Sequence, residues 1–185
     1  MKEALISERL YSSTNKSCRE FEISFNGKKI PPNARVIGEK DSIYLKDIIH
    51  DNSIVLRYSE SHCNTCINTM IENLNKFSNY IESKNIILLS TSVSPNYISQ
   101  IRKVKNIKFS IYELPPDLEN LFKDIDIPYY FVIEKCSMRV NSAFVPQKEY
   151  PELIDAYLKN VIKEYFNYIY SDFAPTRYSI PPTPS

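Results

Sequence analysis

The chain of 185 residues contains no tryptophan and only two glycines, Gly27 and Gly38. A loop that wraps a phosphate group needs several glycines close together, because glycine adopts left-handed backbone conformations without strain. So few glycines therefore exclude a glycine-rich nucleotide-binding loop. A long apolar run is missing as well, so the sequence predicts no membrane-spanning segment.

The chain also has almost no excess charge of either sign, since 23 Lys and Arg residues stand against 22 Asp and Glu residues. No basic stripe alternates with aromatic residues, so we expect no nucleic-acid partner. The first seven residues lack the long apolar stretch of a secretory signal. This start predicts either a cytoplasmic protein or a mature form whose leader has been removed.

The length suits one domain with its own hydrophobic core. We expect a polar arm over residues 1–20, a single domain over 21–170, and a flexible tail over 171–185 that is rich in proline. The four cysteines do not suggest a fold held together by disulfides, because a domain of this size has a sufficient core. Cys18 and Cys136 are single and far apart in the sequence, and both are predicted to be inert thiols.

Strand and helix patterns alternate along the domain. A short strand and a helical turn are expected over 42–49, and further strands over 54–58, 86–90, 107–111, 129–133 and 138–145. Helices are expected over 63–83, 94–104, 115–123 and about 150–169. This order predicts an α/β fold, with a central mixed sheet and helices on both of its faces.

An N-terminal extension is expected before this alternation begins. Residues 21–25 alternate apolar and polar side chains, and Asn26-Gly27 follows them before residues 28–30. Asn-Gly between two such runs is typical of a β-hairpin with a type I′ turn. The sequence therefore predicts a β-hairpin over 21–30, ended by Pro31-Pro32.

A Cys-x-x-Cys pair, Cys63 and Cys66, lies where the strand over 54–58 passes into the helix over 63–83. The unpaired N–H groups and the dipole at a helix N-terminus favour a thiolate over a thiol. The first cysteine should therefore be a good nucleophile near neutral pH, with the second one turn further on. Two unrelated half-buried cysteines, or half of a zinc site, are the alternatives to a redox-active dithiol.

The sequence resembles the thioredoxin superfamily, and within it the envelope-type thiol–disulfide oxidoreductases that share an N-terminal extension with peroxiredoxins. The resemblance covers about residues 40–165 and rests on the segment 42–48, the Cys63/Cys66 pair, the strands at 86–94 and 107–111, and the proline-led strand 127–133. It implies a thioredoxin-like fold and a monomer that exchanges disulfides with a disulfide- or thiol-bearing protein partner. It also implies a redox-active disulfide in place of any metal or organic cofactor, and by analogy a periplasmic or envelope location.

The resemblance further implies that Ile127–Pro128 is a cis peptide bond in a loop beside the dithiol. In the family the backbone of this loop pairs with a substrate chain, so Ile127 and Pro128 are candidate substrate-binding residues. The alternative is an ordinary trans proline at the start of an edge strand.

Three positions depart from the family pattern and bear on the tuning of the dithiol. His62 stands where the family has tryptophan, and its imidazolium form could lower the pKa of Cys63, although a solvated side chain is the alternative. Arg57 stands six residues before Cys63, where many members bury an acid. It could favour thiolates by its charge, point into solvent, or pair with Glu60. Glu60 could itself handle protons or be a plain exposed carboxylate.

Two other functions compete with disulfide exchange. A peroxiredoxin has a Pro-x-x-x-Thr-x-x-Cys frame, but the corresponding positions before Cys63 hold Leu56 and Glu60. A thioredoxin-like scaffold that binds a partner without redox turnover would also fit, with the dithiol vestigial or bound to metal. The sequence favours thiol–disulfide exchange through the catalytic pair Cys63 and Cys66.

Overall fold

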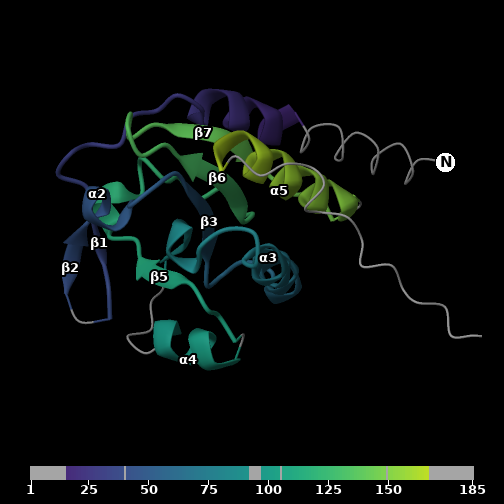
Figure 1. The fold of residues 1–185 in the computed structure, drawn as a ribbon, viewed down its shortest axis with the longest axis horizontal. Coiled ribbons are helices and arrows are strands. Elements are labelled where there is room, and N and C mark those ends of the chain that lie inside the picture. Colours follow the sequence, from purple (N-terminus) through teal and green to yellow (C-terminus); the bar gives the residue numbers. More distant parts are fainter. Residues whose placement is uncertain (1–15, 40, 92–96, 105, 149, 167–185) are drawn as a thin grey trace, which may run out of the picture.

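The computed structural model of the protein describes residues 16–39, 41–91, 97–104, 106–148 and 150–166. Within these residues seven strands form one sheet in the order β2-β1-β5-β4-β3-β6-β7 (Figure 1). The strands are β1 (Arg35–Ile37), β2 (Ser42–Tyr44), β3 (Ser53–Ser59), β4 (Ile86–Thr91), β5 (Ser110–Glu113), β6 (Tyr129–Ile133) and β7 (Val140–Phe144). The helices are α2 (Leu45–Ile48), α3 (Asn64–Phe77), α4 (Tyr97–Val104) and α5 (Glu152–Tyr165), with short 3₁₀ turns at Ser83–Asn85 and Pro116–Leu118.

The sheet is mixed. β3 pairs in parallel with β4, and β4 with β5, whereas β6, β7, β1 and β2 join through antiparallel pairs. β3 lies between β4 and β6, and every residue of it is buried. A strand buried on both faces has to be apolar at nearly every position, which explains the run of residues 54–58. The predicted mixed sheet with helices on both faces is confirmed.

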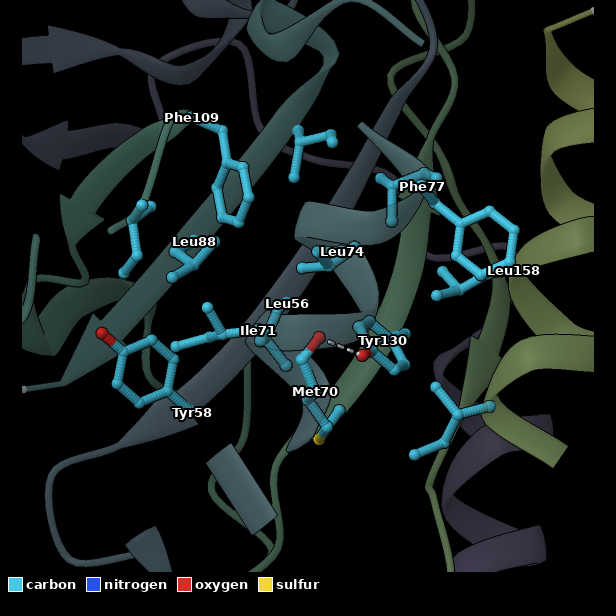
Figure 2. Packing of buried hydrophobic residues seen from close by; sticks show 14 of the residues in the cluster. Leu56, Tyr58, Met70, Ile71, Leu74, Phe77, Leu88, Phe109, Tyr130 and Leu158 are labelled. Carbon is cyan, nitrogen blue, oxygen red and sulfur yellow. Dashed lines mark hydrogen bonds between the residues drawn. The ribbon is translucent and has the colours of Figure 1, made fainter. Parts of the chain in front are cut away.

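Successive side chains of β3 point to opposite faces of the sheet and into two separate cores. Leu56 and Tyr58 belong to the core beneath α3, α4 and α5, and Val55 belongs to the core beneath α2 and residues 16–25. Figure 2 shows the first core, where the Tyr130 hydroxyl of β6 donates to the Met70 carbonyl of α3 at 2.8 Å. The α3 residues that pack there are Ile67, Met70, Ile71, Leu74 and Phe77.

The N-terminal β-hairpin predicted over 21–30 is wrong in its location. Residues 16–25 are helical and lie beside β7 (Figure 1). Phe21 and Phe25 share one helix face and contact Tyr129, with Phe21 4.7 Å from the Tyr129 ring, while Ile23 is 77% exposed. Spacing of i and i+4 thus outweighs the alternation that suggested a strand. The hairpin near this end is formed instead by β1 and β2.

Residues 28–30 are extended, as predicted, but they pair with the C-terminal hairpin. The Gly27 amide donates to the Val140 carbonyl at 2.7 Å, and Lys29 forms a bridge with Arg139. Gly27 has φ +80°, which glycine adopts without strain and which turns the chain from the helix into this pairing. The N-terminal segment therefore covers part of the β7 edge.

Several element ends differ from the predicted ones. α3 ends at Phe77 instead of about 83, because Ser78 donates its hydroxyl to the Asn75 carbonyl, a side-chain bond that competes with helix continuation. Ile81 is still buried, but it lies in the turn that follows. β5 starts at Ser110 instead of 107, and the helix expected over 115–123 is reduced to its first turn. The predicted helix start at Ser94-Pro95 and the predicted tail over 171–185 lie outside the described residues.

Candidate dithiol site

The dithiol lies at the junction of β3 and α3. A turn closes after β3, with the His62 amide donating to the Ser59 carbonyl at 3.0 Å. Cys63 then forms the N-cap of α3, with φ −54° and ψ 116°, and its carbonyl accepts the first helical hydrogen bond from Ile67 at 3.1 Å. Cys63 is exposed and Cys66 is half-buried, and both are free thiols.

The two thiols have opposite acidities. The pKa of Cys63 is lowered to about 7, chiefly by the backbone N–H of Cys66, then by the Cys66 thiol, with smaller help from the Thr65 N–H and the charge of Lys148. The pKa of Cys66 is raised, first by burial and then by its hydrogen bond to Cys63. Cys63 is therefore the more acidic of the two thiols, and Cys66 is the harder one to ionise.

His62, just before the dithiol, is buried, with 5% of its surface exposed, so the solvated alternative is excluded. Its Nδ1 accepts a hydrogen bond from the Ser59 amide at 3.1 Å, and its Nε2 lies 2.9 Å from Asp124 Oδ1. Because Nδ1 accepts, we assign the ring proton to Nε2, which donates to Asp124. The buried ring therefore holds the turn before Cys63 in one orientation.

Arg57 of β3 is fully buried, on the sheet face opposite to α3. Its Nε donates to the Phe122 carbonyl at 3.2 Å, and its Nη1 donates to Asp124 Oδ2 at 3.2 Å. Of the three placements expected for this side chain, solvent exposure is wrong, and its carboxylate partner is Asp124 instead of Glu60. Arginine at this position is tolerated because Asp124, 67 residues away in the sequence, supplies the countercharge.

Asp124 is the site residue that the sequence did not predict. Burial would raise the pKa of its carboxyl, but the hydrogen bonds from His62 and the Asp126 amide, together with the charge of Arg57, outweigh burial and lower it. The carboxylate is thus held in its charged form near neutral pH. Its only sequence signal is an acid four residues before Pro128, which is weak because Asp126 and Glu119 lie nearby.

A groove of about 690 Å³ opens beside both thiols. Ile127 and Pro128 line it, so the proline-led loop and the dithiol do come together. Its charged lining residues are Asp126 and Lys148, and Lys148 is a second residue that the sequence did not single out. The rest of the lining is mostly apolar or small: Cys18, Thr65, Thr69, Met70, Pro146, Gln147, Pro151 and Ile154.

The predicted cis bond at Ile127–Pro128 is wrong, because no peptide bond among the described residues is cis. Asp126 has φ +62° and supplies the change of chain direction before the proline. Because the chain turns at Asp126, the Ile127–Pro128 peptide bond can keep its intrinsically preferred trans form as the chain enters β6. Pro128 is nevertheless buried next to the groove.

The other predicted residues lie apart from the thiol chemistry. The Glu60 amide donates to the Thr91 carbonyl at 3.1 Å, whereas the carboxylate that pairs with Arg57 is that of Asp124. Cys136 is an exposed thiol, whereas Cys18 is buried and lines the groove. Among the residues that the structure describes, no group of three or more His, Cys, Asp or Glu side chains is placed to hold a metal ion, and no helix is long and apolar enough to cross a bilayer.

Comparison of the sequence with protein-family models gives no match, and comparison with curated proteins gives none. Solved structures do match. A Chlorobium tepidum protein assigned as the thiol:disulfide interchange protein DsbE superposes with a TM-score of 0.58 at 13% identity, over 74% of this chain and 97% of that one. A thiol:disulfide interchange protein from Bacteroides sp. gives 0.55 at 13%, over 80% and 95%. A PrxQ mutant from Xylella fastidiosa gives 0.55 at 15%, over 74% and 94%.

These neighbours share the fold at low sequence identity. The chain therefore has the thioredoxin-like α/β fold that its sequence resembles, and it covers nearly the whole length of each of these structures. The neighbours include both disulfide-exchange proteins and a peroxiredoxin, so the fold alone does not choose between the two reactions. That choice has to come from the chemistry of the site.

Proposed function

We propose that the protein is a thiol–disulfide oxidoreductase that exchanges disulfides with a protein partner through Cys63 and Cys66. The observation that carries this proposal is the asymmetry of the two thiols. Cys63 is exposed at the N-terminus of α3 with a pKa of about 7, and Cys66 is half-buried with a raised pKa. An exposed acidic thiol paired with a sheltered one is what a two-step exchange requires.

In the first step the Cys63 thiolate attacks one sulfur of a partner disulfide. A mixed disulfide forms, and the second partner sulfur leaves as a thiolate that takes a proton from water. Cys66 then loses its proton and attacks the Cys63 sulfur. The partner leaves fully reduced, and the protein holds a Cys63–Cys66 disulfide. Two electrons pass from the protein to the partner, and the reverse sequence oxidises the partner.

The structure suggests how Cys66 becomes reactive at the right time. Besides burial, its pKa is raised by the hydrogen bond to Cys63 and by the charge of that thiolate. Both of these influences end when Cys63 enters the mixed disulfide, and the charge of Lys148, which lowers the pKa, remains. The second thiol is therefore easier to ionise after the first has reacted.

The groove supports a polypeptide as the partner. Its volume of about 690 Å³ and mostly apolar lining suit a few side chains around a partner cysteine. Ile127 and Pro128, on the groove wall, are the proposed substrate-binding residues. The electrons travel as thiols, so the exchange requires no metal or organic cofactor.

A thiol peroxidase is the second candidate, because an exposed thiolate at a helix N-terminus would also attack a peroxide, and a peroxiredoxin is among the structural neighbours. Cys63 would then become a sulfenic acid, releasing an alcohol or water, and Cys66 would condense with it to a disulfide and water. The peroxiredoxin frame Pro-x-x-x-Thr-x-x-Cys argues against this reaction. Its proline position holds Leu56, which is buried in the core, and its threonine position holds Glu60.

Reduction of a protein disulfide, with insulin as the probe and a small dithiol as the reductant that regenerates Cys63 and Cys66 in the turnover assay, tests the proposal against both alternatives. We expect turnover by the wild type, loss of turnover in Cys63→Ser, and a trapped mixed disulfide in Cys66→Ser. Cys136→Ser, which changes an exposed thiol outside the groove, should behave like the wild type. Peroxide consumption without insulin reduction would assign the protein as a peroxidase, and neither activity would assign it as a binding scaffold.

A further inference from the structure

We propose that Asp124 is a positioning residue that holds the turn before Cys63 and the loop of Asp126, Ile127 and Pro128 in one fixed arrangement. This inference rests on the proposed function, in which the dithiol and that loop act together on one disulfide. One carboxylate joins three separate parts of the chain: β3, the turn into α3, and the loop into β6. Neither the sequence pattern nor the fold points to this residue.

The first step is the anchor. Arg57 is fully buried in β3 and donates to both the Phe122 carbonyl and Asp124 Oδ2, each at 3.2 Å. Among the described residues, the Arg57 Nη2 is buried without a hydrogen-bond partner. The carboxylate that forms an ion pair with this guanidinium among them is that of Asp124. The segment that carries Asp124 is thereby fixed against the centre of the sheet.

The second step is the arm toward the thiols. Asp124 Oδ1 accepts the His62 Nε2–H at 2.9 Å, and His62 Nδ1 accepts the Ser59 amide at 3.1 Å. Both ring nitrogens are therefore engaged, and the buried ring has one orientation. Because Cys63 follows directly, this ring fixes how the Cys63 sulfur faces the N–H groups of Thr65 and Cys66.

The third step is the arm toward the proline. The same Oδ1 accepts the Asp126 amide at 2.9 Å. Asp126 has φ +62°, a left-handed conformation that costs free energy for a residue with a side chain and therefore needs support. The hydrogen bond to Asp124 supplies that support. Asp126, Ile127 and Pro128 then line the groove beside Cys63.

Substitution of Asp124 separates positioning from charge neutralisation. Asp124→Asn keeps an oxygen that can accept from both His62 and the Asp126 amide, and it removes the charge opposite Arg57. Asp124→Ala removes every bond. If Asp124 positions the site, the asparagine variant retains most of the function and the alanine variant does not. If Asp124 merely neutralises Arg57, both variants lose function to the same extent.

His62→Phe tests one arm alone, because phenylalanine fills the buried space without either hydrogen bond. It should disturb the thiols and leave the proline loop in place. Asp155→Asn is the matched control: Asp155 accepts from Lys76 at 2.9 Å and Lys159 at 2.7 Å, has a lowered pKa like Asp124, and does not line the groove.

Three measurements on full-length protein report the result: the pH dependence of Cys63 alkylation, KM and kcat for a disulfide peptide, and amide exchange over residues 124–127. Asp124→Ala should slow Cys63 alkylation at pH 7 roughly fivefold, raise KM by a similar factor, and speed amide exchange. His62→Phe should slow alkylation with KM within about twofold of the wild type. Asp124→Asn keeps the acceptor for His62 and the Asp126 amide but loses the bond to Arg57, so its values should lie between those of the wild type and Asp124→Ala. Asp155→Asn should stay near the wild type in all three.

Equal losses in Asp124→Ala and Asp124→Asn would overturn the inference, and so would an alanine variant with wild-type values. If Asp124→Ala does not fold, His62→Phe decides: unchanged alkylation would overturn the inference and slower alkylation would support it. Alkylation and amide exchange do not depend on turnover. A wild type without disulfide exchange would therefore end the proposed function and leave the positioning of Asp124 testable on its own.

Discussion

The Cys66 thiol and backbone N–H both hydrogen-bond to Cys63 across the first turn of α3. The two donors lower the pKa of the Cys63 sulfur, because a hydrogen bond to a thiolate stabilises it. The pKa of Cys66 is raised first by burial and then by its hydrogen bond to Cys63, because a thiol that donates to a thiolate is harder to ionise. The helix N-terminus and the second cysteine thus act together. Substitution of residues around this pair should change the acidity of Cys63 in directions that can be measured.

Lys148→Met should raise the pKa of Cys63 slightly. Lys148 is exposed, lines the groove, and is the weakest of the influences that lower this pKa. Alkylation of Cys63 at pH 7 should therefore slow by less than about threefold, and the difference should shrink in high salt as the charge is screened. Lys159→Met, outside the groove, is the control. An unchanged rate at low salt would show that Lys148 does not act on the thiol.

Arg57→Ala should destabilise the protein by about 2–5 kcal/mol, because it empties the space of a fully buried side chain and ends its hydrogen bonds. Arg57→Met fills most of that space and should cost about 1–2 kcal/mol less. In either variant the Asp124 carboxylate loses its partner but can still be solvated, since 39% of its side chain is exposed. Urea denaturation measures both values, and equal losses would contradict the packing explanation.

Glu22→Gln should stabilise the protein near neutral pH. Burial raises the pKa of Glu22, against opposing effects of the Val145 amide and Arg19. A folded-state pKa above the unfolded one means that the protonated form favours folding, so this stability is present below the unfolded pKa and is lost as pH rises through the folded pKa. Glutamine keeps the oxygen that accepts the Val145 amide at 2.7 Å and carries no charge.

Thermal unfolding of Glu22→Gln at pH 7 and pH 3 checks this sign. The variant should exceed the wild type at pH 7 and match it at pH 3, where Glu22 is protonated in both states. Glu20→Gln, at an exposed position of the same helix, should change neither value. A gain that is equal at both pH values would mean that the charge of Glu22 is not responsible.

Features set by local pattern could be predicted from the sequence. The buried strands β3 and β4, the apolar stripe of α3 and the position of Cys63 at its start follow from short-range periodicity and spacing. The sequence of residues 21–25 is compatible with both the two-residue period of a strand and the i, i+4 spacing of a helix, because Phe21 and Phe25 lie on the same face in either structure. Their contacts with Tyr129, more than a hundred residues away, decide for the helix.

The surroundings of the dithiol depend on such distant contacts even more strongly. Arg57 had a nearby acid in Glu60, yet its partner is Asp124, because side chains of β3 alternate between faces and Arg57 points to the face that meets Phe122. Likewise His62 could be solvated or buried until Asp124 is placed beside it. No local rule identifies one carboxylate that serves three segments.

The pH dependence of alkylation at each cysteine of the reduced wild-type protein, measured by mass spectrometry on molecules that carry a single modification, tests the central claim most directly. The structure predicts that Cys63 reacts with a midpoint at about pH 7 and that Cys66 reacts only at a pH above the usual range for a thiol. Equal midpoints for both cysteines at about pH 8.5, the ordinary thiol value, would contradict it.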